Sequence, residues 1–242
     1  MSLHHNQAKH ARELIEPNAS VSNGSVDSVL DAAAIPRERT GRQRTAALAA
    51  PERHLYRWIM RQFGARSRPS LEATAAAAAA AGADLDQALE TFRQLDLVHL
   101  ADGEIAVAYP FSGRPTPHRI SIDGRPEMYA MCAIDALGTA AMLELPTEVL
   151  SRDPVSGGEV WVRIDPGDGA WWEPEQAVVL AGSYPAAGPS FRSCCSVLNF
   201  FESGEHALQY LLAHAEVTGH AITIPEAIAA GAAIFGDLLE ED

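Results

Sequence analysis

The chain has 242 residues, of which 47% are hydrophobic and 21% are charged, as in an ordinary globular protein with a substantial core. Its formal net charge of −14 argues against general binding to polyanions, and no apolar run approaches the roughly 20 residues that a membrane-spanning helix needs. Three cysteines do not make a disulfide framework, and the first residues do not resemble a secretory signal. We therefore expect a cytoplasmic protein with free thiols.

Residues 1–50 show little hydrophobic periodicity, and we predict a flexible tail for them. A short helix from Ser25 to Ala34 is compatible with their composition. Arginines gather in the segment Arg37–Arg44, which could contact phosphates or acidic surfaces. A solvated linker is the simpler interpretation of this segment.

Residues 51–110 carry the pattern of three helices followed by a hairpin. Apolar residues recur at helical spacing after Pro51, after the cap residue Ser70 and after the cap residue Asp84. Two short alternating runs then flank the turn residues 101–103. This order predicts a winged-helix-like domain over residues 51–110. The third helix is rich in carboxylates, which phosphates would repel, so we interpret the domain as structural and nucleic-acid binding as unlikely.

Strand and helix patterns mix without a regular βαβ repeat in residues 111–242. We expect strands at 118–122, 159–165, 176–180 and 194–201, and helices at 128–143, after Gly204 and at 226–239. This pattern predicts an α+β fold in which a mixed-sheet α+β catalytic domain over residues 111–242 follows the winged-helix-like domain.

The thiols and one carboxyl form the most distinctive group of side chains. Cys132 and Asp135 are three residues apart in a predicted helix and therefore share one face. The other thiols, Cys194 and Cys195, are adjacent in a predicted strand, so only one of them can face Cys132, and parity does not say which. Thiolates are ligands for soft metals, and an aspartate ionised at neutral pH can take a thiol proton. The dipole of the helix would also favour a thiolate at Cys132.

Other chemistries fit these residues less well. A structural zinc site needs three or four closely spaced ligands, and no histidine is near a cysteine in the sequence. A cysteine hydrolase needs a positioned base, but no local signature singles out one of His118, His206, His214 and His220. An inert, buried thiol at Cys132 is the remaining simple interpretation.

Three blocks of sequence resemble the alkylmercury (organomercurial) lyase family. They are Thr116–Gly124 (TPHRISIDG), Met128–Leu137 (MYAMCAIDAL) and the stretch from Cys194-Cys195 to Phe200-Phe201, in this order. The likeness runs from about Pro51 to the C-terminus. It implies that Cys132 and Cys194 bind mercury, that Asp135 shuttles the proton and is a further metal ligand, and that Cys195 is a non-catalytic neighbour.

The function implied by this resemblance is protonolysis of carbon–mercury bonds, which gives a hydrocarbon and Hg(II) in mercury detoxification. The resemblance implies no cofactor apart from Hg(II) bound as product. The partners would be an organomercurial small molecule and, for the Hg(II), small thiols or a mercuric reductase, with no role for a membrane. The alternative is a family relative that binds or senses a soft metal ion without lyase activity. A winged-helix regulator with a thiol sensor is a third class, which the acidic third helix disfavours.

The chain departs from the family pattern at two places. Asp153 falls in the region where family members often carry a further cysteine, which takes no part in the reaction. Residues 196–199 follow the paired cysteines as Ser-Val-Leu-Asn, where a histidine is common in the family. The second departure suggests a different range of substrates.

Overall fold

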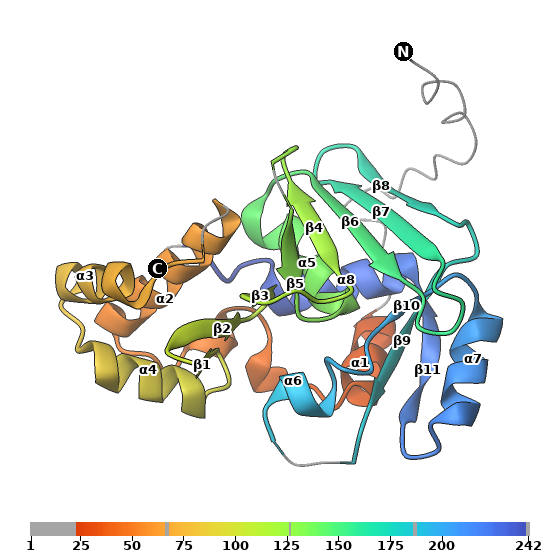
Figure 1. The fold of residues 1–242 in the computed structure, drawn as a ribbon, viewed down its shortest axis with the longest axis horizontal. Helices are drawn as coiled ribbons and strands as arrows, with labels where there is room; N and C mark the ends of the chain where they lie inside the picture. Colours follow the sequence, from red (N-terminus) through yellow and green to blue (C-terminus); the bar gives the residue numbers. More distant parts are fainter. Residues whose placement is uncertain (1–22, 66–67, 126, 186–187, 241–242) are drawn as a thin grey trace.

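The protein combines a large sheet, a small sheet and helices packed against both (Figure 1). The computed structural model describes residues 23–65, 68–125, 127–185 and 188–240. The helices are α1 (Asn23–Ala32), α2 (Ala50–Gly64), α3 (Leu71–Ala81), α4 (Leu85–Gln94), α5 (Ala133–Leu143), α6 (Ser190–Ser193), α7 (Gly204–Ala213) and α8 (Ile224–Phe235), with the short 3-10 helices η1 (Arg37–Arg39) and η2 (Gly41–Thr45). The predicted α+β class is confirmed. None of the described helices is both long and apolar enough to cross a membrane.

The large sheet has eight strands in the order β1-β2-β3-β5-β4-β6-β7-β8, and the small sheet has three in the order β10-β9-β11. The strands are β1 (Val98–Ala101), β2 (Glu104–Ala108), β3 (Phe111–Ser112), β4 (Arg119–Ile122), β5 (Met128–Ala130), β6 (Thr147–Arg152), β7 (Glu159–Asp165), β8 (Gly169–Glu173), β9 (Val178–Ser183), β10 (Phe200–Phe201) and β11 (Thr218–Thr223). All pairings among these strands are antiparallel, whereas a mixed sheet was expected.

The three helices and the hairpin predicted after Pro51 are present as α2, α3, α4, β1 and β2. Ser70 and Asp84 cap α3 and α4, because their side chains accept hydrogen bonds from Ala73 N and Gln87 N. The hairpin is not a separate wing, however. Strand β2 pairs with β3, so the large sheet continues across the predicted domain boundary at residue 110.

Helix α5 is the central helix of the fold. It lies between one face of the large sheet and α8, and the side chains of Ala133 to Ala140 are buried. Gly138 and Gly231 let α5 and α8 touch directly. A Cβ atom on Gly138 would lie 2.7 Å from Gly231 O, and one on Gly231 would lie 2.7 Å from Gly138 N. The position of α5 therefore depends on two residues that have no side chain.

The prediction of a flexible tail over residues 1–50 is wrong for residues 23–50. Helix α1 packs against α8 and the small sheet (Figure 1), and Val29, Leu30, Ala33 and Leu48 belong to the main core. These few apolar residues are buried because they meet apolar faces from the other end of the chain. Residues 1–22 of the predicted tail lie outside the described residues.

Two predicted elements near the cysteines also differ. The stretch from Met128, predicted as helix, begins as strand β5, because residues Met128–Ala130 pair with β3 and β4. The strand predicted over 194–201 is a turn that reaches strand geometry only at Phe200–Phe201. Tertiary hydrogen bonds determine both segments, and local sequence periodicity does not report them.

Candidate active site

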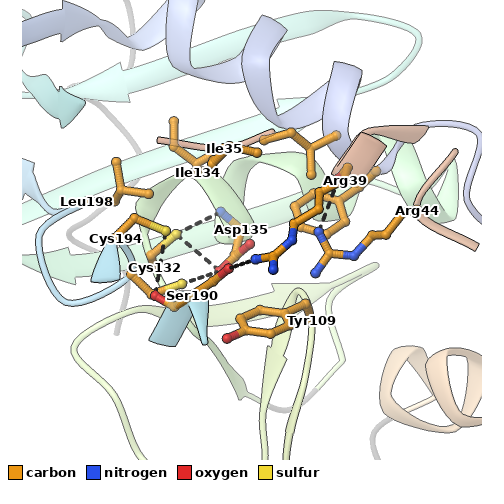
Figure 2. A pocket seen from close by; sticks show the side chains of 13 residues that line it. Ile35, Arg39, Arg44, Tyr109, Cys132, Ile134, Asp135, Ser190, Cys194 and Leu198 are labelled. Atoms are coloured by element: carbon orange, nitrogen blue, oxygen red, sulfur yellow. Dashed lines mark hydrogen bonds between the residues drawn. The ribbon is translucent and has the colours of Figure 1, made fainter. Parts of the chain in front are cut away.

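A cavity of about 20 Å³, enough for about one water molecule, brings together all three predicted site residues (Figure 2). Cys132, Asp135 and Cys194 contribute to its wall, and so does Cys195. The other lining residues are Ile35, Arg39, Arg44, Tyr109, Ile134, Ser190, Leu198, Ile234 and Phe235. They come from segments far apart in the sequence, so only the complete fold forms the cavity.

Cys132 lies at the N-cap of α5, directly after β5. Its backbone is extended (φ −154°, ψ −179°), and its Sγ accepts a hydrogen bond from Asp135 N at 3.4 Å. The thiol in turn points at the carboxylate, with 3.1 Å between Cys132 Sγ and Asp135 Oδ2. The cap geometry therefore places a thiol proton against a carboxylate oxygen.

Burial determines the proton affinities of this pair. It raises the pKa of Cys132 to about 12, and a hydrogen bond from Cys195 only partly opposes this effect. Burial also raises the pKa of Asp135 to about 6, against the lowering effects of the Cys132 hydrogen bond and the Arg44 charge. The expectation of a thiolate favoured by the helix dipole is therefore wrong for this state. At neutral pH the pair is a thiol beside a carboxylate.

Cys194 and Cys195 lie in a tight turn after α6. Ser190 O accepts hydrogen bonds from Cys194 N at 3.0 Å and from Cys195 N at 2.9 Å, and Cys194 Sγ lies 3.5 Å from the same oxygen. Because this turn is not a strand, the expected alternation does not apply, and both thiols reach the cavity. The turn explains why the sequence alone predicted only one cavity-facing thiol here.

Cys195 is the thiol of this turn that approaches Asp135. The distance from Cys195 Sγ to Asp135 Oδ2 is 3.7 Å. One potential ligand atom each from Cys132, Asp135 and Cys195 lies within 4.8 Å of the others, as around a single metal ion. Interaction with Cys132 and Cys194 raises the pKa of Cys195, and interaction with Cys195 lowers the pKa of Cys194. The three sulfurs and the carboxyl thus form one connected group.

Asp96, two residues after the end of α4, anchors the cysteine turn. It is 3% exposed and accepts hydrogen bonds from Ser190 N at 2.9 Å, Ser190 Oγ at 2.6 Å and Arg39 Nη1 at 2.8 Å. His99 Nε2 lies 2.6 Å from its other oxygen. Burial raises the pKa of Asp96, but these contacts outweigh it and leave the pKa lowered. A fixed Ser190 holds the turn, because its carbonyl binds both cysteine amides.

The arginine segment 37–44 forms one wall of the cavity and is not the solvated linker that was the simpler expectation. Arg44 is only 8% exposed, and its guanidinium lies 5.2 Å from the Tyr109 ring centroid and 5.6 Å from that of Phe235. Its Nη2 donates to Asp96 O. Figure 2 shows Arg39 and Arg44 side by side in the wall. The sequence shows this cluster of positive charge, but it does not reveal that the arginines contact Asp96.

The histidines considered for a hydrolase are elsewhere. Among the described residues that line the cavity, none is a histidine. Burial lowers the pKa of His118 to about 4, and its Nδ1 lies 2.9 Å from Ser151 Oγ. A catalytic base needs one ring nitrogen within reach of the reacting group, but His118 is 1% exposed and does not line the cavity, so it is a neutral core residue.

A second group with metal-binding residue types surrounds Asp153, near the surface. Asp153, Glu202 and His206 have potential ligand atoms within 4.8 Å of one another. The Asp153 oxygens already accept hydrogen bonds from Val155 N at 2.7 Å and Glu202 N at 2.9 Å, and His206 Nδ1 lies at 2.6 Å. These contacts make Asp153 a structural connection between two loops.

Comparisons with known proteins agree with the geometry of the cavity. The sequence model of the alkylmercury lyase family matches residues 111–236. The chain is 31% identical over 140 residues to the alkylmercury lyase of Staphylococcus epidermidis, covering 57% of this chain and 64% of that protein. It is 32% identical over 105 residues to the alkylmercury lyase of Streptomyces lividans, covering 43% of this chain and 48% of that protein. The matches thus span less than two thirds of these relatives.

A solved structure shows the same fold. The crystal structure of the mercury-bound form of MerB2 aligns with a TM-score of 0.69 and 20% sequence identity, covering 88% of this chain and 100% of that chain. The family match covers more than half of the sequence, including Cys132, Asp135, Cys194 and Cys195. The chain therefore belongs to the alkylmercury lyase family.

Proposed function

We propose that this protein is an organomercurial lyase, which cleaves carbon–mercury bonds by protonolysis in mercury detoxification. The observation that carries the proposal is the Cys132–Asp135 pair, a buried thiol 3.1 Å from a buried carboxylate, with further thiols in the same cavity wall. Thiolates bind mercury as soft ligands, and the carboxyl supplies a proton where water is largely excluded. The organomercurial is the substrate, and no separate cofactor takes part.

The reaction starts from R–Hg–X, where R is the organic group and X a thiolate. Asp135 takes the Cys132 proton and passes it to X, which leaves as XH while Cys132 binds mercury. Asp135 then takes the Cys194 proton as the second sulfur binds. Two thiolates increase electron density on the carbon, and Asp135 protonates it as the carbon–mercury bond breaks. The products are RH, XH and Hg(II) on two sulfurs, so all atoms are accounted for and mercury stays divalent.

Small thiols or a mercuric reductase in the cytoplasm would then accept the Hg(II). Both adjacent thiols of the Cys194–Cys195 turn reach the cavity. This turn is therefore the wall from which we expect mercury to pass to an incoming thiol.

Hydrocarbon release tests the proposal. Purified protein, phenylmercury and excess small thiol are sealed together, and benzene in the headspace is measured by gas chromatography. We expect Cys132→Ala and Asp135→Ala to lose at least about 100-fold of the rate, since each removes a group that acts in the transition state. Asp168→Ala, at an exposed turn, is the matched control. Benzene release by Cys132→Ala at the normal rate would refute the assignment.

The alternative is a family member that holds a soft metal ion without cleaving a bond. The cluster of three buried cysteines supports metal binding as such. Tight Hg(II) binding without any benzene from phenylmercury would favour this alternative over the lyase.

A further inference from the structure

Cys195 takes no part in the mechanism above, yet it lies inside the cavity. It is only 6% exposed, and its Sγ is 3.7 Å from Asp135 Oδ2. Its ligand atom lies within 4.8 Å of those of Cys132 and Asp135. Cys195 therefore approaches the same carboxylate oxygen that accepts the Cys132 hydrogen bond.

We propose that Cys195 is a third sulfur ligand of the Hg(II) product. The inference rests on the proposed function for the origin of that Hg(II), but not for the ligand set itself. Cys132, Cys194 and Cys195 then hold the ion together, which suits a soft cation better than two sulfurs and a carboxylate oxygen. The turn geometry makes this possible, because both of its thiols reach the same cavity.

Asp135 accepts the proton that this binding step releases. Once this carboxyl has protonated the departing carbon, it is again a carboxylate beside Cys195. Formation of the third mercury–sulfur bond releases the Cys195 proton, which moves to Asp135 Oδ2. No electron transfer is involved. The ion with three thiolates carries one net negative charge, and the buried guanidinium of Arg44 in the same wall stabilises it.

X-ray absorption at the mercury edge tests the ligand set. One equivalent of Hg(II) chloride is added to the full-length protein, and the number of sulfur neighbours is determined. We expect three sulfurs for the wild type and two for Cys195→Ala and Cys195→Ser. Ser196→Ala, in the same turn but exposed, is the matched control and keeps three. The serine variant preserves the size of the side chain and decides the test if the alanine variant does not fold.

Retention of the metal gives a second readout. We expect both Cys195 variants to lose Hg(II) to a competing small thiol at a concentration at least about tenfold lower than the wild type does. Two sulfurs in the wild type, or three in the Cys195 variants, would overturn the inference. Benzene release is measured separately. Release with only two sulfurs leaves the lyase standing and refutes the third ligand, whereas three sulfurs without release support the ligand set and refute the lyase.

Discussion

The Asp135 carboxyl is buried at the start of a helix, among thiols and apolar side chains. Charged groups are costly in such places, and the contacts from Cys132 and Arg44 offset only part of this cost, so its pKa stays raised from 3.8 to about 6. The folded state therefore binds the Asp135 proton more tightly than the unfolded state does. The associated stability is complete below about pH 4 and is lost as the pH rises through about 6.

Replacing this carboxyl should show the cost directly. A shift of about two pKa units corresponds to about 3 kcal/mol. The loss of stability of Asp135→Asn relative to the wild type should therefore be larger at pH 4 than at pH 8, by roughly that amount. Urea unfolding at both pH values measures the difference. The same effect of the substitution at pH 4 and pH 8 would contradict the raised pKa.

Single residues of the site were predictable where chemistry could be read from residue type. Cys132 and Asp135 were predicted from residue type and spacing, Cys194 was chosen over Cys195 by the family resemblance, and all three line one cavity. The position of Cys195 was not predictable, because alternation holds for strands and this residue lies in a turn. The strong burial of Cys132 was equally invisible, since it depends on neighbours from other parts of the chain.

At the scale of elements, the position of α6 and of the turn after it depends on Asp96, which lies just after α4. Asp96 binds both the amide and the hydroxyl of Ser190, and it also pairs with Arg39. Asn cannot accept as many hydrogen bonds and carries no charge. We expect Asp96→Asn to lower the free energy of unfolding by about 1–3 kcal/mol, because buried donors lose partners.

Urea unfolding of Asp96→Asn tests this expectation. Asp86→Asn, an exposed change on α4, serves as control and should stay within about 0.5 kcal/mol of the wild type. Equal stabilities of the two variants would show that Asp96 does not hold the turn.

Elements were predictable from the sequence where their signals are local. The capping residues Ser70 and Asp84 marked helix starts because each satisfies backbone groups within its own first turn. Strand β5 and the cysteine turn were predicted incorrectly. Ala133 N donates to Leu198 O at 2.9 Å, so one backbone hydrogen bond joins these segments across 65 residues, and no periodicity reveals it.

For the molecule as a whole, the N-terminal segment 23–50 completes both the core and the cavity. Leu30 is 3% exposed, whereas Leu212 on α7 is 78% exposed. We expect Leu30→Ala to cost about 2–4 kcal/mol of unfolding free energy, since it leaves a cavity against α8. The same change at Leu212 should cost less than about 0.5 kcal/mol. Thermal or urea unfolding compares the two, and similar losses would show that α1 is not part of the cooperative core.

The α+β class was predictable because strand-like alternation and helical spacing coexist in residues 111–242. The contribution of residues 23–50 was not. Their apolar residues are too sparse to mark a core element alone, and they are buried only because α8 and the small sheet offer matching faces. The sequence also did not reveal that the sheet continues across residue 110, because the pairing of β2 with β3 depends on the complete fold.

The contact between Gly138 and Gly231 has a consequence for size selectivity. Helices that touch backbone to backbone act as one rigid body, so Cys132 at the start of α5 and Phe235 at the end of α8 keep a fixed separation. A cavity of about 20 Å³ must widen to admit a phenyl group. That widening has to come from walls outside this rigid body, which include the arginine segment 37–44, Tyr109 and the cysteine turn. Under the proposed function, the arginine segment 37–44, which lies outside the residues that the family model matches, would then limit the size of the organic group that enters.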